Sequence, residues 1–396
     1  MWWLDRMKGI FGERDKAGNV WYYGSDIEGF KKSGSYLNLS FENFVLMTIC
    51  SLRSKIYSQM KIQHFDKNGK EIIDSPYLKL FKQPNYFQSQ EDFLFCQMWF
   101  LSATGNDYCY EIKSGNDTSA LYNLIPSEID FKDANKIKKF LVKKSDIKAY
   151  EEQKIVYTLD GETHNIEIKN IIPFYDLANG MSKNSFMHSR SRVEGIDPVL
   201  QNIQENIKSK NINLKFSQKY IISSASDGNE VQLQEGDRTD ITRKIGAKSV
   251  IITNQKILAT HLVSDFKKLF LDEQLSADAL FCLNAFDMNK DVLNYFKDGS
   301  TYENQEKAML NYIQNSIQVD ANNTMNSFAS HWGLIDIGDY FTASYDHLPI
   351  MQIIIGQKIT TLKTFQDLLK IGIENGTMTA KEGKKQYDLL SKKLGL

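Results

Sequence analysis

Proline is scarce in this chain: six occur among 396 residues, and no low-complexity tract or internal repeat is visible. Because a proline ring fixes φ and disfavours helical geometry in the residue before it, each one marks a joint between elements and not a long linker. The length and the 42% hydrophobic content allow two or more packed domains, or one domain with long projecting elements. The prolines are Pro76, Pro84, Pro126, Pro173, Pro198 and Pro349.

Long apolar runs are also missing. None approaches the roughly 20 residues that span a bilayer, so we expect no membrane partner. The opening MWWLDRMKGIFG places Trp3, Met7, Ile10 and Phe11 on one side of a short helix. Because this segment has few basic residues, we favour a docking arm for a neighbouring subunit over a helix lying on a membrane surface.

Cysteine and histidine are few and are spaced poorly for metal chemistry. The cysteines lie far apart in apolar or aromatic surroundings, with neither zinc-ligand spacing nor the density of a disulfide framework. We therefore expect buried free thiols in a reducing cytoplasm. The six histidines never fall at ligand spacing, and we expect no metal and no cofactor. The cysteines are Cys50, Cys96, Cys109 and Cys282.

Catalytic motifs are absent as well. The Lys248-Ser249 pair lacks the glycines of a phosphate-binding loop, and there is neither a G-x-S-x-G nucleophile elbow nor an H-E-x-x-H zinc motif. The most basic polar cluster is His188-Ser189-Arg190-Ser191-Arg192, which would suit contact with DNA or a scaffold partner. Short charged clusters are usually surface features, however, so a solvated loop is the favoured interpretation.

An excess of positive charge is missing too, since 48 basic residues face 49 acidic ones and the formal net charge is −1. Proteins that grip DNA over a wide surface carry a basic excess, because Lys and Arg must displace the counterions condensed on phosphates. If this chain meets DNA, it should do so loosely.

The sequence does contain a series of well-marked elements. Apolar residues at helical spacing predict a helix over residues 36–63. Ser89 with Asp92 forms a capping box at the start of another helix, and Gly105 supplies its left-handed stop. Strands are expected at 107–112, 121–124, 139–143, 154–159 and 166–168.

A second group of elements follows residue 195. Asp197 is expected as the N-cap and Pro198 as the first residue of a helix that runs to about Phe216. Its apolar stripe is thin, so it cannot be buried all round. A small strand–helix–strand insert follows, with strands at 219–223 and 249–253. Further helices are expected at 264–286, at 302–332 and in the tail, with a strand at 340–345, a break at Gly376 and a cap at Thr379.

Several short motifs occur in a fixed order. A GN-x-Y strand begins at Gly105 and an L-x-P strand end lies at Leu124; G-I-D-P at Gly195 resembles G-x-S-P. Tyr302 opens a Y-x-N helix start, and Gly376 opens G-x-x-T-x-x-E. Taken in order over roughly residues 36–390, the chain resembles the portal proteins of tailed double-stranded-DNA bacteriophages, in particular the compact portals of long-tailed phages.

There are two departures from that family. Where a proline usually ends its second stem helix, this chain has Met288-Asn289, and where a proline often lies within its third helix, this chain has Val319-Asp320. Both concern the local backbone of the tunnel region and leave the topology unaffected.

The resemblance implies an α+β fold with portal architecture that assembles as a ring. The implied parts are an N-terminal arm and wing (1–195), a first stem helix (196–216), a clip (217–263), a second stem helix (264–286), a tunnel loop (287–300), a wing helix and strand (301–350) and a short helical crown (351–396).

The resemblance also implies a function. A ring, commonly of twelve subunits, would occupy one capsid vertex of a virion assembled in the host cytoplasm, and double-stranded DNA would pass through it without sequence-specific contacts. The implied partners are the terminase large subunit, which would hydrolyse ATP, a head–tail adaptor, and the major capsid and scaffold proteins; this chain would not be an enzyme. The alternative is a soluble α/β enzyme of unidentified activity. A ring with a central hole would distinguish the first from a compact monomer.

Site residues follow from the same resemblance. Mixed charge in the tunnel loop suits a low-friction lining that touches phosphates without reading sequence, although an ordinary surface connection between helices is the alternative. The expected DNA-channel residues are Asp287, Asn289, Lys290, Asp291, Asn294, Lys297 and Asp298. The expected stem interface comprises Ile203, Ile207, Phe266, Phe270 and Leu280. Lys208, Lys210 or Lys215 would face the channel or a neighbouring subunit.

Overall fold

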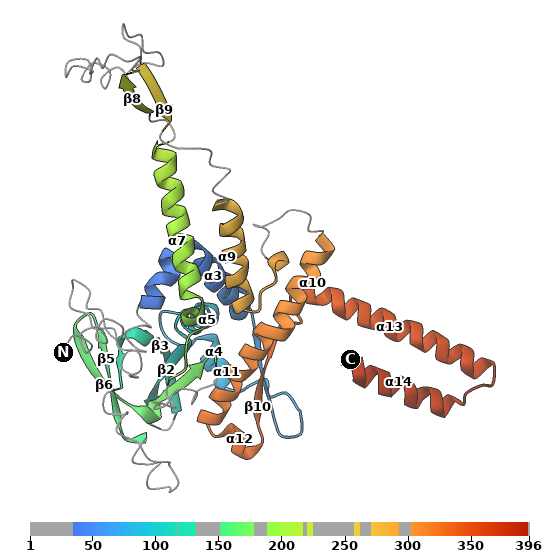
Figure 1. The fold of residues 1–396 in the computed structure, drawn as a ribbon. Coiled ribbons are helices and arrows are strands. Elements are labelled where there is room, and N and C mark those ends of the chain that lie inside the picture. The colour runs from blue at the N-terminus through green and yellow to red at the C-terminus, as the bar shows by residue number, and fades with distance from the viewer. Residues whose placement is uncertain are drawn as a thin grey trace, which may run out of the picture. The chain divides into compact units, whose positions relative to one another are not determined.

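The computed structural model describes residues 35–115, 117–131, 151–177, 188–216, 220–224, 257–261, 271–292 and 302–394. The chain divides into two compact units, Met1–Ile196 with Leu283–Leu396 and Asp197–Cys282. Helices and strands are mixed along the chain (Figure 1), which confirms the expected α+β class. The strands predicted at 139–143 and 249–253 lie outside the described residues.

Two antiparallel helices, α3 (Phe44–Ser58) and α5 (Gln90–Thr104), pack together in the larger unit. Gln90 at the start of α5 donates from Nε2 to the carbonyl of Met60, which follows α3 (3.1 Å). Near the other end, Nε1 of Trp99 donates to the hydroxyl of Ser40 (3.0 Å). The capping box and the left-handed stop at Gly105 (φ 77°) are both present, so the prediction for α5 is confirmed.

The single helix predicted over 36–63 is wrong in two respects. Residues 35–42 are helical, but the backbone of Asn43 is extended and its side chain accepts from the amides of Val45 and Leu46, which starts α3 anew. After α3 ends, β1 (Lys61–Phe65) buries alternate residues and pairs antiparallel with β10 (Tyr340–Ser344). The two-residue alternation of β1 overrode the helical pattern before it.

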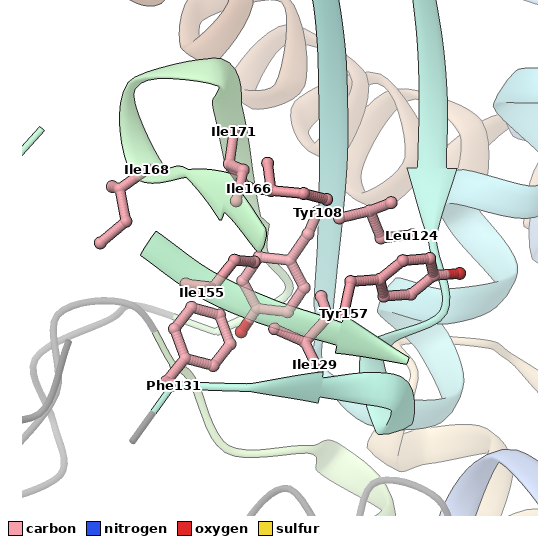
Figure 2. Packing of buried hydrophobic residues seen from close by; sticks show 9 residues of the cluster. All are labelled: Tyr108, Leu124, Ile129, Phe131, Ile155, Tyr157, Ile166, Ile168 and Ile171. Carbon is pink, nitrogen blue, oxygen red and sulfur yellow. The ribbon is translucent and has the colours of Figure 1, made fainter. Parts of the chain in front are cut away.

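Two antiparallel sheets complete the N-terminal part. In one, β2 (Asn106–Ser114) lies between β3 (Asp117–Leu124) and β7 (Ile171–Tyr175). In the other, β5 (Lys154–Leu159) lies between β4 (Ile129–Asp130) and β6 (Glu162–Glu167). Their shared apolar cluster is shown in Figure 2 and consists of Tyr108, Leu124, Ile129, Phe131, Ile155, Tyr157, Ile166, Ile168 and Ile171. The short helices η1 (Pro126–Glu128) and η3 (Ile168–Asn170) connect β3 with β4 and β6 with β7, and α4 (Pro76–Lys82) lies between β1 and α5.

A long helical segment follows residue 301. It comprises α10 (Tyr302–Tyr312), a π-helical turn (Ile313–Ile317) and α11 (Gln318–His331), and the short helix α12 (Leu334–Ile337) follows. The amide of Gln318 bonds the carbonyl of Ile313, five residues earlier, which defines the wider turn. The predicted start at Tyr302 is confirmed, and α11 packs on β7 and β10.

The tail is a hairpin of two helices, α13 (Pro349–Glu374) and α14 (Ala380–Leu394). Gly376 has φ 70°, and the amide and hydroxyl of Thr379 both bond the carboxylate of Glu382. The predicted break and cap are therefore confirmed.

Helices α7 (Arg192–Phe216) and α9 (Leu271–Ala285) bracket an antiparallel strand pair, β8 (Tyr220–Ser224) and β9 (Ile257–His261). The helix start predicted at Asp197 and Pro198 is wrong, because α7 begins earlier and contains Pro198 in its interior. The hydroxyl of Ser191 accepts from the amide of Val193 (3.0 Å) and provides the cap that was assigned to Asp197.

All four cysteines are free thiols; Cys96 is half-buried and the other three are buried. No helix within the described ranges combines the length and the apolar character needed to cross a bilayer.

Candidate functional site

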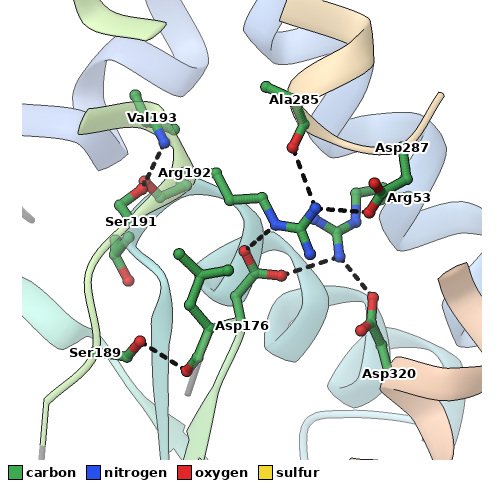
Figure 3. A network of polar contacts seen from close by, with 12 residues as sticks. Arg53, Asp176, Ser189, Ser191, Arg192, Val193, Ala285, Asp287 and Asp320 are labelled. Atoms are coloured by element: carbon green, nitrogen blue, oxygen red, sulfur yellow. Dashed lines mark hydrogen bonds and ion pairs between the residues drawn. The ribbon is translucent and has the colours of Figure 1, made fainter. Parts of the chain in front are cut away.

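A fully buried arginine, Arg53 of α3, lies where several segments meet (Figure 3). Its Nη2 atom donates to Oδ1 of Asp176 (3.2 Å), directly after β7, and to Oδ2 of Asp320 (2.7 Å) in α11. The ring centroid of Phe286 is 5.3 Å from the guanidinium carbon. Burial disfavours the charge, but the two carboxylates outweigh it and raise the pKa of Arg53, so the guanidinium stays ionised.

A second arginine extends the network. Arg192, the first residue of α7, donates from Nε to the other oxygen of Asp176 (2.7 Å). Its Nη1 atom donates to the carbonyl of Ala285 (3.1 Å), the last residue of α9, and to Oδ2 of Asp287 (2.7 Å). Asp176 is thus shared by two guanidinium groups, and charge-assisted bonds of this kind are the strongest in proteins.

We call these five charged residues the polar anchor: Arg53, Asp176, Arg192, Asp287 and Asp320. They fix the first residue of α7 and the last turn of α9 to α3 and α11, within the larger unit. A buried ion-pair network adds little net stability over an apolar core, but it tolerates only one arrangement of its partners. The polar anchor therefore serves to position α7 and the end of α9 relative to α3 and α11.

The solvated loop predicted for residues 188–192 is wrong. His188, Ser189 and Ser191 are buried, and only Arg190 is largely exposed. The amide of Ser189 donates to Oδ1 of Asn106 (2.7 Å), and Nδ2 of Asn106 donates back to the carbonyl of Ser189 (2.8 Å). These hydrogen bonds hold the segment against the first residue of β2 and position Arg192 for its contacts in the polar anchor.

The first part of the predicted tunnel loop forms a compact turn. Asp287 has φ 58°, a left-handed conformation that Asp tolerates better than most residues, and its carboxylate is paired with Arg192. Oδ1 of Asn289 accepts from the amide of Asp291 (3.2 Å), and a 3₁₀ turn, Lys290–Val292, follows and packs against α10. Asn294, Lys297 and Asp298 lie outside the described residues.

The predicted stem residues differ in solvent exposure. Ile203 is fully buried within the chain, whereas Ile207 and Leu280 are partly exposed. Lys208 is exposed and pairs with Glu205 (2.7 Å), and Lys210 is partly exposed. Lys215 belongs to α7, but its side chain lies outside the described part, as do Phe266 and Phe270. Phe281, beside Leu280, is an exposed apolar residue that the sequence analysis missed.

Two other buried carboxylates were also missed. Glu111 of β2 bonds Nε2 of His331 (2.9 Å), Nε1 of Trp332 (3.0 Å) and the hydroxyl of Thr118; burial opposes its charge, but these bonds outweigh it and lower the pKa of Glu111 to about 2. Burial raises the pKa of Asp107 to about 8, although Gln97 acts in the opposite direction. Both carboxylates lie in β2, but only Glu111 is hydrogen-bonded, whereas neither carboxylate oxygen of Asp107 has a hydrogen-bond partner among the described residues.

Neither carboxylate completes a reactive constellation. Among the described residues, no group of three His, Cys, Asp or Glu side chains could hold a metal ion. A cavity of about 300 Å³ borders the polar anchor, but its two carboxylates, Asp176 and Asp320, are already paired with Arg53.

No family model and no curated protein matches this chain. Solved structures do match its fold. A chain from the neck of an empty gene transfer agent particle, computed with C6 symmetry, has a TM-score of 0.64 and 13% identity, covering 84% of this chain and 89% of that one. A chain from the native neck, with C12 symmetry, has a TM-score of 0.60 and 13% identity over 92% and 94%.

A crystal structure of an HK97-family phage portal protein from Corynebacterium diphtheriae matches with a TM-score of 0.50 and 11% identity, covering 78% of this chain and 96% of that one. At these identities the likeness shows the fold alone. It confirms, at that level, the resemblance carried by the short sequence motifs.

Proposed function

We propose that this chain, which has the phage portal fold, forms a ring at one capsid vertex of a virion and serves as the conduit for DNA packaging and ejection. One observation carries the proposal: 92% of the chain superposes on a chain from a particle neck with C12 symmetry. A cyclic ring needs an interface that joins each copy head-to-tail to the next, and twelve copies are the expected number.

In this proposal α7 and α9 are the stem helices and the β8–β9 pair belongs to the clip. Partly exposed apolar residues such as Ile207 and Leu280 would pack against neighbouring stems, while Lys208 and Lys210 would face the channel or a neighbour. The remaining assignments follow the sequence: arm and wing before α7, wing helix and strand in 301–350, and crown in 351–396.

The polar anchor has a direct role in such a ring. An external motor that moves DNA through the channel exerts load on the stem and the tunnel loop, and both start at residues held by Arg192 and Arg53. Because each carboxylate of the network faces a guanidinium group, the start of α7, the end of α9 and Asp287 keep one position relative to α3 and α11.

Contact with DNA would be weak and without sequence preference. A net charge of −1 over the chain and alternating charges in residues 287–298 limit the phosphate neutralisation that tight binding requires. Energy for translocation would come from a terminase large subunit docked on the ring, and a head–tail adaptor, major capsid protein and scaffold protein would be the other partners.

Electron microscopy of the purified full chain tests the proposal. We expect rings with a central hole, and native mass spectrometry of the same sample should give twelve subunits. A compact monomer at all concentrations, with or without capsid and scaffold proteins from the same source, would overturn it.

A further inference from the structure

Two neighbouring aromatic side chains are presented to solvent between α4 and α5. Tyr86 is 88% exposed and Phe87 is 81% exposed, and their rings meet edge to face with centroids 5.3 Å apart. We call this pair the aromatic knob. Exposed aromatic residues of this size are characteristic of protein interfaces, where they supply much of the binding free energy.

The knob stands on a rigid base. Asn85 is buried, its Oδ1 atom accepts from the amides of Phe87 (2.9 Å) and Gln88 (3.0 Å), and its Nδ2 atom donates to the carbonyl of Leu121 (2.9 Å). The amide of Leu121 bonds the carbonyl of Pro84 in return (2.7 Å). Because the backbone is already fixed, burying the two rings in a partner would require little further ordering.

A second apolar surface lies at the start of α3. Phe41, Phe44 and Met47 are spaced three residues apart and are 59%, 41% and 42% exposed. Phe41 stacks on Trp99 with ring centroids 5.2 Å apart, so the base of this surface is also held in place. We call it the apolar patch. Its methionine is flexible and polarisable, which suits contact with aromatic rings.

The knob and the patch lie at opposite ends of the α3–α5 pair. The knob directly precedes α5, whose first residue, Gln90, contacts the end of α3 through Met60. The patch adjoins Trp99, which lies nine residues after Gln90 in α5. The patch lies at the start of α3 and Gln90 contacts Met60 just past its end; because a helix of 15 residues is about 22 Å long, roughly 20 Å separates these two ends.

We propose that the aromatic knob of one copy packs into the apolar patch of the next copy around the ring. The inference rests on the proposed function and names residues of its subunit interface. Two different surfaces at opposite ends of one rigid helix pair match a head-to-tail contact, which closes into a ring when the rotation is right.

The composition of the loop favours a second copy over nucleic acid. Residues 84–88 contain no charged side chain, whereas a DNA contact is built on Lys and Arg. Two aromatic side chains bury about 300–500 Å² together, a large part of the roughly 800 Å² per partner in a stable interface.

The first experiment removes the knob. We expect Tyr86→Ser with Phe87→Ser to shift the full chain from rings to smaller species in mass photometry, with an unchanged circular dichroism spectrum. Ile73→Ser is the matched control, since Ile73 is 82% exposed but belongs to neither surface, and it should form rings normally. Normal rings from the double variant would overturn the inference while leaving the proposed function intact.

The second experiment is independent of ring yield. Phe87→Cys and Met47→Cys in one chain should give, under mild oxidation, a ladder of crosslinked oligomers on a denaturing gel. Each single variant and the wild type, with its buried or half-buried cysteines, should give none. Dimers from a single variant would indicate a two-fold contact, and absence of the ladder in intact rings would indicate another interface; either result refutes the inference. A wild type that never forms rings would instead refute the proposed function.

Discussion

Replacing Asp176 by asparagine tests the polar anchor most directly. The Asp176 side chain is 1% exposed and each oxygen faces a different guanidinium group, so the change removes the charge shared by Arg53 and Arg192 with almost no change in volume. Losing one partner of a buried pair costs about 3–5 kcal/mol. We expect about 4 kcal/mol of lost stability, because Arg53 keeps Asp320 and Arg192 keeps Asp287.

The free energy of unfolding can be measured by denaturant titration followed through tryptophan fluorescence, to which Trp99 and Trp332 of the larger unit contribute. Glu205→Gln makes the same chemical change at an exposed pair, Glu205 with Lys208, and should cost less than about 0.5 kcal/mol. The double variant Arg53→Met with Asp176→Asn should lose less stability than the sum of the losses of the two single variants. Arg53→Met removes the guanidinium charge that Asp176→Asn alone would leave without this carboxylate.

A cost below about 1 kcal/mol for Asp176→Asn would refute the reasoning, because it would mean that the buried guanidinium groups do not depend on this carboxylate. Strict additivity in the double variant would refute it as well.

Three further predictions concern charge and assembly. The pKa of Asp107 is about 8 in the folded chain and near 3.8 when unfolded, so unfolding releases a proton between these pH values. The free energy of unfolding therefore falls as pH rises through that window. Denaturant titrations at pH 6 and pH 9 should show the wild type losing about 3 kcal/mol more stability than Asp107→Asn over this interval. An equal pH dependence in both proteins would contradict this. Leu280→Asp should abolish rings in electron microscopy, whereas Gln274→Asp on an exposed position of α9 should not; rings from Leu280→Asp would show that α9 is not an interface. Deleting residues 290–298 should leave rings intact and impair DNA packaging. Packaging equal to that of the wild type would show that these residues are not the tunnel loop.

Local signals in the sequence were sufficient for α5 and for the tail. Ser89, Asp92 and Gly105 lie within one short segment, and each acts on backbone groups a few residues away. The same is true of Gly376 and Thr379. Such elements can be predicted because their determinants and their consequences are neighbours in the chain.

The polar anchor could not be predicted in this way. Arg53 is separated from its two carboxylates by 123 and 267 residues, and nothing near Arg53 in the sequence identifies Asp176 or Asp320 as its partners. For the same reason the segment ending at Arg192 was taken for a solvated loop, since its composition is the same whether its partners are water or a distant carboxylate. The break at Asn43 was missed because apolar spacing continues through it. Asparagine is nevertheless a preferred N-cap residue, and its side chain here accepts from the first amides of α3.

The π-helical turn between α10 and α11 has a consequence for the length of this segment. A residue advances an α-helix by about 100°, so the wider turn sets the phase between α10, which packs on the 3₁₀ turn at Lys290–Val292, and α11, which aims Asp320 at Arg53. Deleting one residue from Ile313–Ile317 would restore regular α-helical bonding and rotate one partner surface away from its contact. The length of Ile313–Ile317 therefore sets the rotation of α11 relative to α10, and we expect a deletion there to be more disruptive than a substitution.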